Sequence, residues 1–367
     1  MIKTRSELSR RKYGLSSILR PIEPLQTGAM TKTLEHQQPL GSGFTAFTTT
    51  DEVLAGIDLT GKNVIITGGH SGLGLASTEA LSKAGASVTV AARDTNAAAA
   101  AVAGIDGVQV EQLDLLTPQS IDAFAAAYVS SGRPLHVLIN NATAVSRELV
   151  VDARGYEATF AVAYLGHFQL TLGLLPALRA ARGARVVNVA SGSHRLTDIR
   201  WDDLNFTGGY DSNLAYGQSK TALILFATEL DRRWATDGIR GYSLHPGISV
   251  ATSLHKESGS LYDLAQLRAL GLIGGDDQPI IDPEREKKTP RQAAATIVFA
   301  AASPLLDGIG GVYLKNCDIA PVDSRPLTPE MLAAGDISTD LAPYAADPAS
   351  ARRLWALAER LLAGSVQ

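Results

Sequence analysis

The stretch Asn63-Val64-Ile65-Ile66-Thr67-Gly68-Gly69-His70-Ser71-Gly72-Leu73-Gly74 decides the fold. Its first five residues are mostly apolar and β-branched, which predicts a buried strand, and the glycines that follow predict a tight turn. A helical pattern then runs from Gly72 to Ala84. Where a strand ends in such a turn and a helix starts, backbone N–H groups can hold the pyrophosphate of a dinucleotide. The stretch therefore predicts the opening of a nucleotide-binding α/β domain.

The rest of the chain repeats this alternation up to about residue 315. Alternating strands and helices predict an α/β fold, here a single Rossmann-type, doubly wound parallel sheet of about seven strands with helices on both faces. Several strands are continuous Val/Ile/Leu runs, as expected when both faces of a sheet are covered. The predicted strands are Asn63–Thr67, Ser87–Ala92, Val108–Gln112, Leu135–Asn140, Ala184–Ala190, Ile239–His245 and Gly310–Leu314. The predicted helices are Gly72–Ala84, Thr95–Ala103, Pro118–Ser130, Gly155–Arg182, Leu214–Thr236 and Pro290–Ala302.

Three regions are expected along the chain. Residues 1–50 read as a largely disordered extension, whose first 29 residues weakly resemble a targeting peptide. Residues 51–325 form the catalytic domain, with substrate-loop inserts near 192–213 and 248–289. Residues 326–367 form a helical tail, in which Leu354, Leu357, Ala358 and Leu361 follow the spacing of an apolar helix face. This face is expected to dock on the core, and a homodimer contact is the alternative.

The composition excludes several classes of partner. A net charge of -4 over 367 residues offers no positive field for a nucleic acid or an anionic membrane. No apolar run approaches the roughly 20 residues that span a bilayer. The single cysteine favours a reducing, cytoplasmic location. The histidines are dispersed and no metal site is expected.

The segment Tyr216-Gly217-Gln218-Ser219-Lys220 carries the predicted chemistry. Residues four apart share one face of a helix, so the phenol and the ammonium lie together. A neighbouring cation favours the phenolate, which makes Tyr216 a general base or acid. With the glycine turn, this pair predicts hydride transfer to or from a nicotinamide.

The motifs together resemble the short-chain dehydrogenases/reductases. They are Thr67-Gly68-(x)3-Gly72-Leu73-Gly74, Asp114-Leu115, Asn140-Asn141-Ala142, Ser191, Tyr216-(x)3-Lys220 and His245-Pro246-Gly247. The chain looks most like the retinol-dehydrogenase-like branch, through Leu165-Gly166-His167-Phe168, Ser193-His194-Arg195 and Trp201-Asp202-Asp203. The resemblance covers about residues 55–320.

The resemblance implies a role for each matched position. Tyr216, Lys220 and Ser191 would be catalytic, with Ser191 holding the substrate oxygen. Thr143, His194 and Ile248 are expected beside the substrate, a lipophilic alcohol or carbonyl. The cofactor would contact Gly68, His70, Ser71, Gly72, Leu73, Gly74, Arg93, Asp114, Leu115, Asn141, Ala142, Tyr216, Lys220, Pro246 and Gly247.

The choice between NADP and NAD depends on the residues after the second strand. Arg93 stands where an acid would grip a ribose 2′-hydroxyl, and a guanidinium suits a 2′-phosphate. NADP is therefore favoured, although Asp94 keeps NAD open. Asp114 is interpreted either as an adenine contact or as a loop carboxylate.

One residue departs from the family pattern. Ala163 stands where the family has an asparagine that supports a water-mediated proton path to the lysine. A methyl group cannot hydrogen-bond, so that path is replaced, weakened or abandoned here. The alternative function is therefore a cofactor-binding scaffold or a non-redox catalyst.

Overall fold

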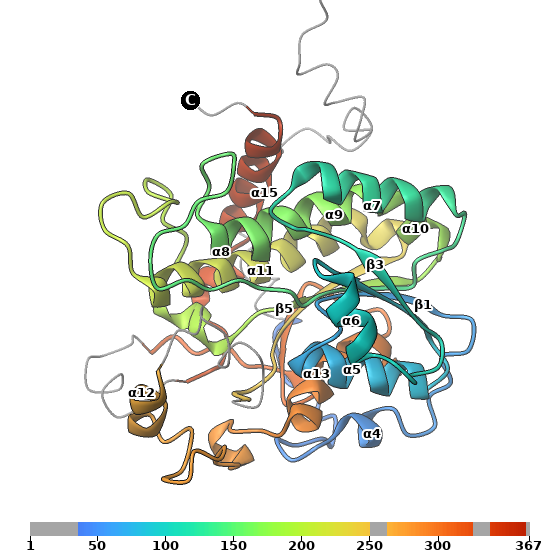
Figure 1. Cartoon of the computed structure of the whole chain (residues 1–367), viewed down its shortest axis with the longest axis horizontal. Helices are drawn as coiled ribbons and strands as arrows, with labels where there is room; N and C mark the ends of the chain where they lie inside the picture. Colours follow the sequence, from blue (N-terminus) through green and yellow to red (C-terminus); the bar gives the residue numbers. More distant parts are fainter. Residues whose placement is uncertain (1–35, 250–262, 326–337, 365–367) are drawn as a thin grey trace, which may run out of the picture.

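A computed structural model describes residues 36–249, 263–325 and 338–364. The described residues form one sheet of eight strands in the order β3-β2-β1-β4-β5-β6-β7-β8. Figure 1 shows this sheet between helices above and below it. All neighbouring pairs are parallel except β7 and β8. The strands are β1 (Asn63–Thr67), β2 (Ser87–Ala92), β3 (Val108–Gln112), β4 (Val137–Asn140), β5 (Ala184–Val189), β6 (Ile239–His245), β7 (Val312–Lys315) and β8 (Asp318–Ile319). The fold-class prediction is confirmed, with the short β8 as an addition.

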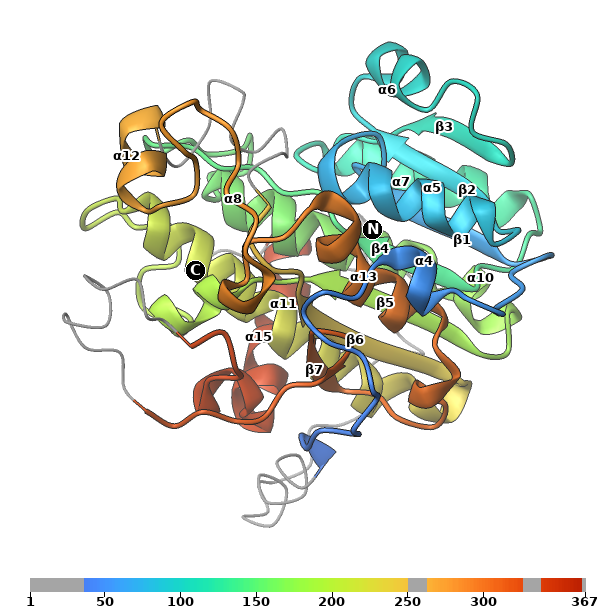
Figure 2. The same cartoon turned by 90° about the horizontal axis from the view of Figure 1, so that it is seen from below.

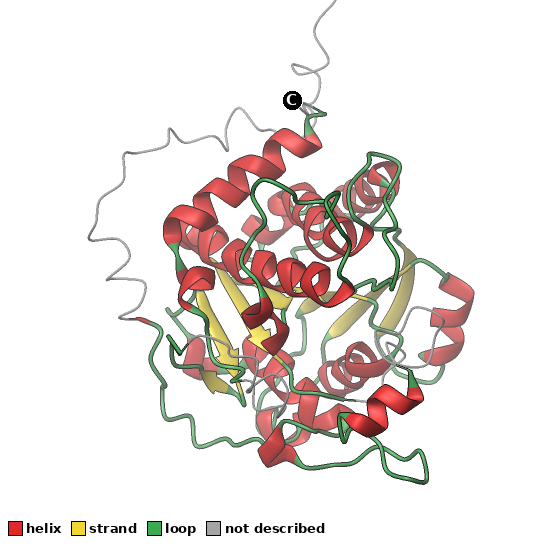
Figure 3. Ribbon diagram, turned by 90° about the vertical axis from the view of Figure 1, so that its left-hand side faces the viewer, coloured by secondary structure: helices red, strands yellow, loops and turns green. Residues whose placement is uncertain are grey.

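Helices cover both faces of the sheet (Figure 3). Along β1, Ile65 enters the core cluster on one face, whereas Val64 and Ile66 enter the cluster on the other. On the Ile65 face lie α7 (Pro118–Ser130), α9 (His167–Gly173), α10 (Leu175–Ala180) and α11 (Ser212–Trp234). On the other face, α5 (Gly72–Lys83), α6 (Thr95–Ala101), α13 (Pro290–Ala302) and α4 (Thr50–Val53) pack, and α5 and α13 lie side by side (Figure 2).

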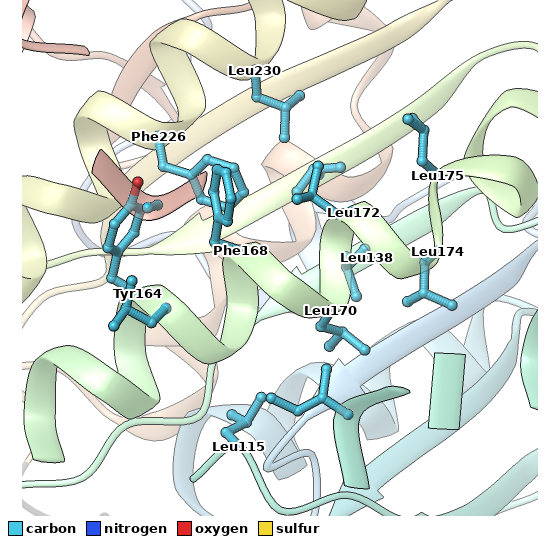
Figure 4. Packing of buried hydrophobic residues seen from close by; sticks show 14 of the residues in the cluster. Leu115, Leu138, Tyr164, Phe168, Leu170, Leu172, Leu174, Leu175, Phe226 and Leu230 are labelled. Carbon is cyan, nitrogen blue, oxygen red and sulfur yellow. The ribbon is translucent and has the colours of Figure 1, made fainter. Parts of the chain in front are cut away.

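The aromatic part of the core joins α9, α11 and the tail helix α15 (Pro348–Leu362). Tyr164, Phe168 and Phe226 point toward one another among leucines (Figure 4). The ring of Trp355 on α15 lies 4.8 Å from that of Phe168, centroid to centroid, and is buried. The tail helix thus docks on its own core, as its apolar stripe predicts. That stripe is not available for a homodimer contact.

The predicted helix Gly155–Arg182 is formed from Ala158 to Ala180, but its hydrogen-bonding pattern changes along the run. Its range contains α8 (Ala158–Phe160), a π-helical segment Ala161–Gly166, α9 and α10. Gly166 packs so tightly that an added Cβ would lie 2.7 Å from the carbonyl oxygen of Leu115. Pro176 lies in the first turn of α10, where its missing N–H costs nothing. The helical prediction is thus confirmed for Ala158 to Ala180, and the π-helical segment inside it is a feature that the apolar periodicity did not indicate.

The described part of the N-terminal extension packs on the edge of the sheet. The side-chain amide of Gln37 donates to the carbonyl oxygens of Tyr313 and Ala320 and accepts from the Tyr313 N–H. The carboxylate of Asp318 accepts backbone N–H bonds from residues 40–42. These bonds hold a polar segment that has little apolar surface to bury. For residues 36–50 the expectation of disorder is wrong, and residues 1–35 lie outside the described part.

Within those described ranges, no helix has the length and apolar character needed to cross a membrane.

Candidate active site

The glycine turn lies at the point where the strand order reverses. The chain winds from β1 to β2 and β3 on one side and from β4 to β7 on the other, so β1 and β4 flank the switch point. Ligands of doubly wound sheets bind in the crevice at this point. Gly68 and Gly72 have positive φ angles of 65° and 52°, which a residue with a side chain rarely adopts. This predicted turn is therefore formed where a dinucleotide would be expected.

Close packing inside the turn explains a further glycine. A Cβ on Gly74 would collide with the carbonyl oxygen of Gly68 and lie 2.9 Å from Asn141 Nδ2. The Ser71 side chain, at the N-cap of α5, accepts no capping hydrogen bond from the backbone N–H groups of the first turn. Backbone N–H groups at such a helix start can bind phosphate. His70 and Leu73 lie within the same turn, as predicted, and both are partly exposed.

Thr67 joins this turn to the end of β4. Its hydroxyl accepts from the N–H groups of Asn141 and Ala142, both at 2.9 Å. The Asn141 amide donates back to the Thr67 carbonyl oxygen at 2.9 Å. The structure thus brings two of the predicted cofactor motifs together. Beside them, Thr143 Oγ1 is buried with no hydrogen-bond partner in the protein, and a buried unsatisfied hydroxyl fits a site built for a polar ligand.

Arg93 and Asp94, the two residues after β2, have different surroundings. Asp94 caps α6, and its carboxylate accepts from the Ala97 N–H at 3.0 Å. Arg93, one residue earlier, is exposed. The carboxylate is thus engaged by its own helix, whereas the guanidinium is accessible.

Asp114 and Leu115 were expected to contact the cofactor, but the side chain of each is engaged within the protein. The Asp114 carboxylate accepts from the Leu116 N–H and from the Thr117 hydroxyl, both at 3.0 Å. This is the loop-carboxylate alternative, although each oxygen keeps a second lone pair. The Leu115 side chain is buried in the core (Figure 4). Its backbone alone is therefore left for a nucleotide contact.

The tyrosine and lysine lie on one face of α11. Lys220 Nζ is 5.1 Å from the centroid of the Tyr216 ring. The same ammonium donates to the carbonyl oxygen of Val189 at 3.0 Å, which fixes it to the end of β5. Ser191 follows two residues later and caps the 3-10 turn Gly192–Leu196. The three predicted catalytic residues thus belong to two elements joined through the lysine.

Burial controls the charge of Lys220. The side chain is enclosed, and desolvation lowers the pKa of its amine from 10.5 to about 7. The charge beside Tyr216 is therefore sensitive to pH near neutrality.

The backbone around Ala163 carries an interaction that the sequence did not reveal. Ala163 is fully buried in the π-helical segment, and its carbonyl oxygen lies 2.8 Å from His167 Nδ1. The other ring nitrogen lies 2.8 Å from Thr67 Oγ1. Desolvation lowers the His167 pKa to about 4, so the ring is neutral and links the helix to the glycine turn. The spacing of Ala163 and His167, four residues, was the only signal available.

The substrate-side residues have different surroundings. Ile248 begins the second insert and pairs with the end of that insert: its N–H donates to the Glu286 carbonyl oxygen at 2.6 Å, and its carbonyl oxygen accepts from the Lys288 N–H at 2.8 Å. Pro246 and Gly247 precede it, and Gly247 has a φ of 97° and packs against the Lys288 side chain. Part of this insert, residues 250–262, lies outside the described residues.

The prediction that His194 contacts substrate conflicts with its position. The ring has no exposed surface. Nδ1 lies 2.7 Å from the Ser191 carbonyl oxygen, and Nε2 accepts from the Ala342 N–H at 3.1 Å. Both nitrogens are thus occupied by backbone groups, because the C-terminal segment covers the ring.

Within the ranges that the structure describes, no group of three or more His, Cys, Asp or Glu side chains is placed to hold a metal ion.

A glycine turn at the switch point of a parallel sheet, together with a tyrosine and lysine pair on a helix of the same domain, is the arrangement of a nicotinamide-dependent oxidoreductase. The family described as short chain dehydrogenase matches residues 62–262. The chain belongs to the short-chain dehydrogenase/reductase family and is an oxidoreductase of that family.

Known relatives agree with this assignment. A probable oxidoreductase of Streptomyces lividans is 41% identical over 307 residues, which cover 82% of this chain and 97% of that protein. The human WW domain-containing oxidoreductase is 35% identical over 329 residues, 86% of this chain and 71% of that protein. A 3-ketoacyl-(acyl-carrier-protein) reductase from Brucella melitensis, solved with NADH, matches in fold with a TM-score of 0.55 and 21% identity, covering 70% of this chain and 97% of that one.

Proposed function

We propose that this chain interconverts an alcohol and its carbonyl on a lipophilic small molecule, with NAD(P) as cofactor and Tyr216 as general acid and base. One observation carries the proposal: Lys220 lies 5.1 Å from the Tyr216 ring and is anchored to the strand that leads to Ser191. A lysine buried in this way without a function would be costly. Its position beside a phenol supplies such a function, because the ammonium favours the phenolate of Tyr216.

A bound nicotinamide supplies the hydride in the reducing direction and accepts it in the oxidising one. In reduction, Tyr216 donates its phenolic proton to the carbonyl oxygen of the substrate. The protonated Lys220 stabilises the resulting phenolate electrostatically. Ser191 donates a hydrogen bond to the same substrate oxygen and stabilises its developing negative charge. In oxidation the phenolate removes the alcohol proton, and the same groups act in reverse.

The residues present fit such a cofactor. The Gly74 position has no room for a side chain, and the orphan Thr143 hydroxyl lies on the loop beside it in space. The turn Gly68 to Gly74, with Asn141 and Ala142, would hold the pyrophosphate and the nicotinamide end. Pro246 and Gly247 would border the nicotinamide from the end of β6. We favour NADP over NAD, because Arg93 is exposed whereas Asp94 is engaged as a helix cap.

The character of the substrate rests on the inserts and their surroundings. Exposed apolar side chains occur in the segment after Thr143 and in the second insert: Leu149, Val150, Val151, Leu264, Leu270, Ile280 and Ile281. We propose that these side chains border the substrate, and such a border would favour a lipophilic molecule. On the same grounds, and on the motifs at Leu165–Phe168, Ser193–Arg195 and Trp201–Asp203, we propose that the chain belongs to the retinol-dehydrogenase-like branch. We also propose that residues 51–325 form the catalytic domain and that its inserts near 192–213 and 248–289 are substrate loops. For the location we propose the cytoplasm, where the buried Cys317 would stay reduced.

The test is turnover of NADPH against a panel of aliphatic and aromatic ketones, followed at the absorbance band of the reduced nicotinamide. Tyr216→Phe should abolish turnover and leave the Kd for NADPH within about twofold, because the lost hydroxyl acts on the substrate. Tyr128→Phe is a matched control, since Tyr128 lies on α7 and its hydroxyl donates to the Pro134 carbonyl oxygen, away from the site. Comparable activity in Tyr216→Phe would contradict the assigned acid and base.

A second function is favoured by one observation, the buried methyl group of Ala163. A cofactor-binding scaffold or non-redox catalyst would bind NADPH tightly and turn over no carbonyl. Turnover that appears only in Ala163→Asn would support this second function for the natural chain. That variant must be checked for folding, because an amide would be inserted into the apolar cluster that contains Ala190, Leu223 and Ile224.

A further inference from the structure

One peptide unit next to the proposed active site has both of its polar atoms held by histidines. The carbonyl oxygen of Ser191 lies 2.7 Å from Nδ1 of His194. The N–H of Gly192, on the other side of the same peptide bond, donates to Nδ1 of His245 at 2.9 Å. Both imidazoles are buried. The peptide that leaves β5 is thus clamped from two sides.

The partners define the tautomer of each ring. His194 Nε2 accepts from the Ala342 N–H, which can only donate, so Nδ1 carries the proton and donates to Ser191. His245 Nδ1 accepts from Gly192, so Nε2 carries the proton and points to Glu286 Oε2, 3.9 Å away. Burial lowers the pKa of both rings far below 6.5, His194 to about 3. One ring donates and the other accepts, and neither changes role near neutral pH.

The His194 side of the clamp is itself held by distant parts of the chain. The Tyr344 hydroxyl donates to the backbone carbonyl oxygen of His194 at 2.6 Å, and the Tyr313 ring packs on the imidazole at 5.0 Å, centroid to centroid. A Cβ on Gly192 would lie 2.5 Å from Thr339 Cγ2, so the C-terminal segment packs directly on the clamped peptide. The clamp therefore couples the segment 339–344 to the end of β5.

We propose that His194 and His245 are positioning residues that orient the Ser191 hydroxyl by clamping the Ser191–Gly192 peptide. This inference rests on the proposed function, in which Ser191 holds the substrate oxygen. Ser191 Oγ lies two bonds from the Cα atom at which the clamped peptide begins, so a shift of that peptide unit displaces the hydroxyl. Misplacement of a catalytic group by about 1 Å costs on the order of 10²-fold in rate. Loss of either clamp should lower kcat while leaving cofactor affinity unchanged.

The matched variants at His245 are leucine and asparagine. Leucine removes the acceptor, whereas the side-chain oxygen of asparagine lies near the Nδ1 position and restores it. His245→Leu should lower kcat by about 10- to 100-fold, and His245→Asn should recover most of that loss. The same His245→Leu change in a Ser191→Ala background should cost less than about threefold, because the group that it orients is gone. An equal loss in both backgrounds, or no recovery with asparagine, would overturn the clamp.

The variants at His194 separate its two bonds. Asparagine keeps a donor near Nδ1 for Ser191, and glutamine keeps an acceptor near Nε2 for Ala342. His194→Asn should retain more kcat than His194→Gln, even if glutamine gives the more stable protein. The reverse order of kcat would contradict the assignment of the Ser191 bond as the one that matters.

A measurement without turnover keeps the clamp testable if the proposed function fails. The Gly192 amide should exchange slowly with deuterium in the wild-type protein, at least about tenfold faster in His245→Leu, and slowly again in His245→Asn. This can be followed by NMR on protein labelled with ¹⁵N-glycine. Absence of carbonyl turnover with this exchange pattern would reject the function and support the clamp. Exchange that leucine does not change would reject the clamp whatever the activity.

Discussion

Replacing Lys220 with methionine should change how the stability of the protein depends on pH. Burial lowers the pKa of this amine from 10.5 to about 7 in the folded chain. In the unfolded chain the ordinary value returns, so between pH 7 and 10.5 the unfolded state binds more protons than the folded state. The unfolding free energy contributed by this group therefore rises with pH across that window. The methionine variant lacks the titrating group and should lack this rise.

The size of the effect follows from the same two values. A fall from 10.5 to about 7 corresponds to a full penalty on the order of 5 kcal/mol below pH 7. Between pH 7 and pH 9 the wild type should regain about 2 kcal/mol relative to Lys220→Met. At pH 7 the variant should be the more stable protein, because it avoids the desolvation penalty of the amine. It also loses the hydrogen bond to the Val189 carbonyl oxygen, which reduces its advantage by about 1 kcal/mol.

The assay is urea unfolding followed by tryptophan fluorescence at pH 7, 8 and 9, with the wild type minus the variant as the quantity of interest. Other titrating groups cancel in that difference. Tyr216→Phe serves as a control that keeps Lys220 and should keep the rise with pH. A difference that stays constant over the three pH values would refute the reasoning, because the amine would then titrate alike in both states.

Three further changes test other parts of the structure. Trp355→Ala should lower the unfolding free energy by about 3–5 kcal/mol, measured by urea titration, because a buried indole that packs on Phe168 is removed; a loss below about 1 kcal/mol would contradict the docking of the tail. Gly74→Ala should weaken NADPH binding by more than about tenfold in calorimetry, because the added methyl would collide with the Gly68 carbonyl oxygen. Arg93→Ala should raise the Kd for NADPH by about 10- to 100-fold and leave that for NADH within about twofold, and equal losses would argue against a 2′-phosphate contact.

Local patterns predicted the framework of the fold well. The strands β1, β2, β3 and β6 have the predicted bounds, because each is a short run containing apolar residues that is bounded by glycine, proline or polar turn residues. The tyrosine and lysine pair needed only helical spacing to be recognised. Such features depend on neighbours within a few residues of each other, so the sequence displays them directly.

Features that depend on distant partners were missed or misjudged. His194 was expected beside the substrate, but its partner Ala342 lies 148 residues further along the chain. Gln37 was expected in a disordered segment, yet it bonds to Tyr313, 276 residues away. The π-helical segment after Phe160 was not predicted, because its apolar residues continue the pattern of the flanking helix.

The side chain of Gln37 also limits how the molecule can assemble. It both donates to and accepts from the backbone of Tyr313, in the manner of an adjoining peptide group. Together with β8, it saturates the outer border of β7 that an incoming strand of a second chain would need. Strand-to-strand growth of the sheet is blocked at these positions, so copies that associate there would have to do so through side chains.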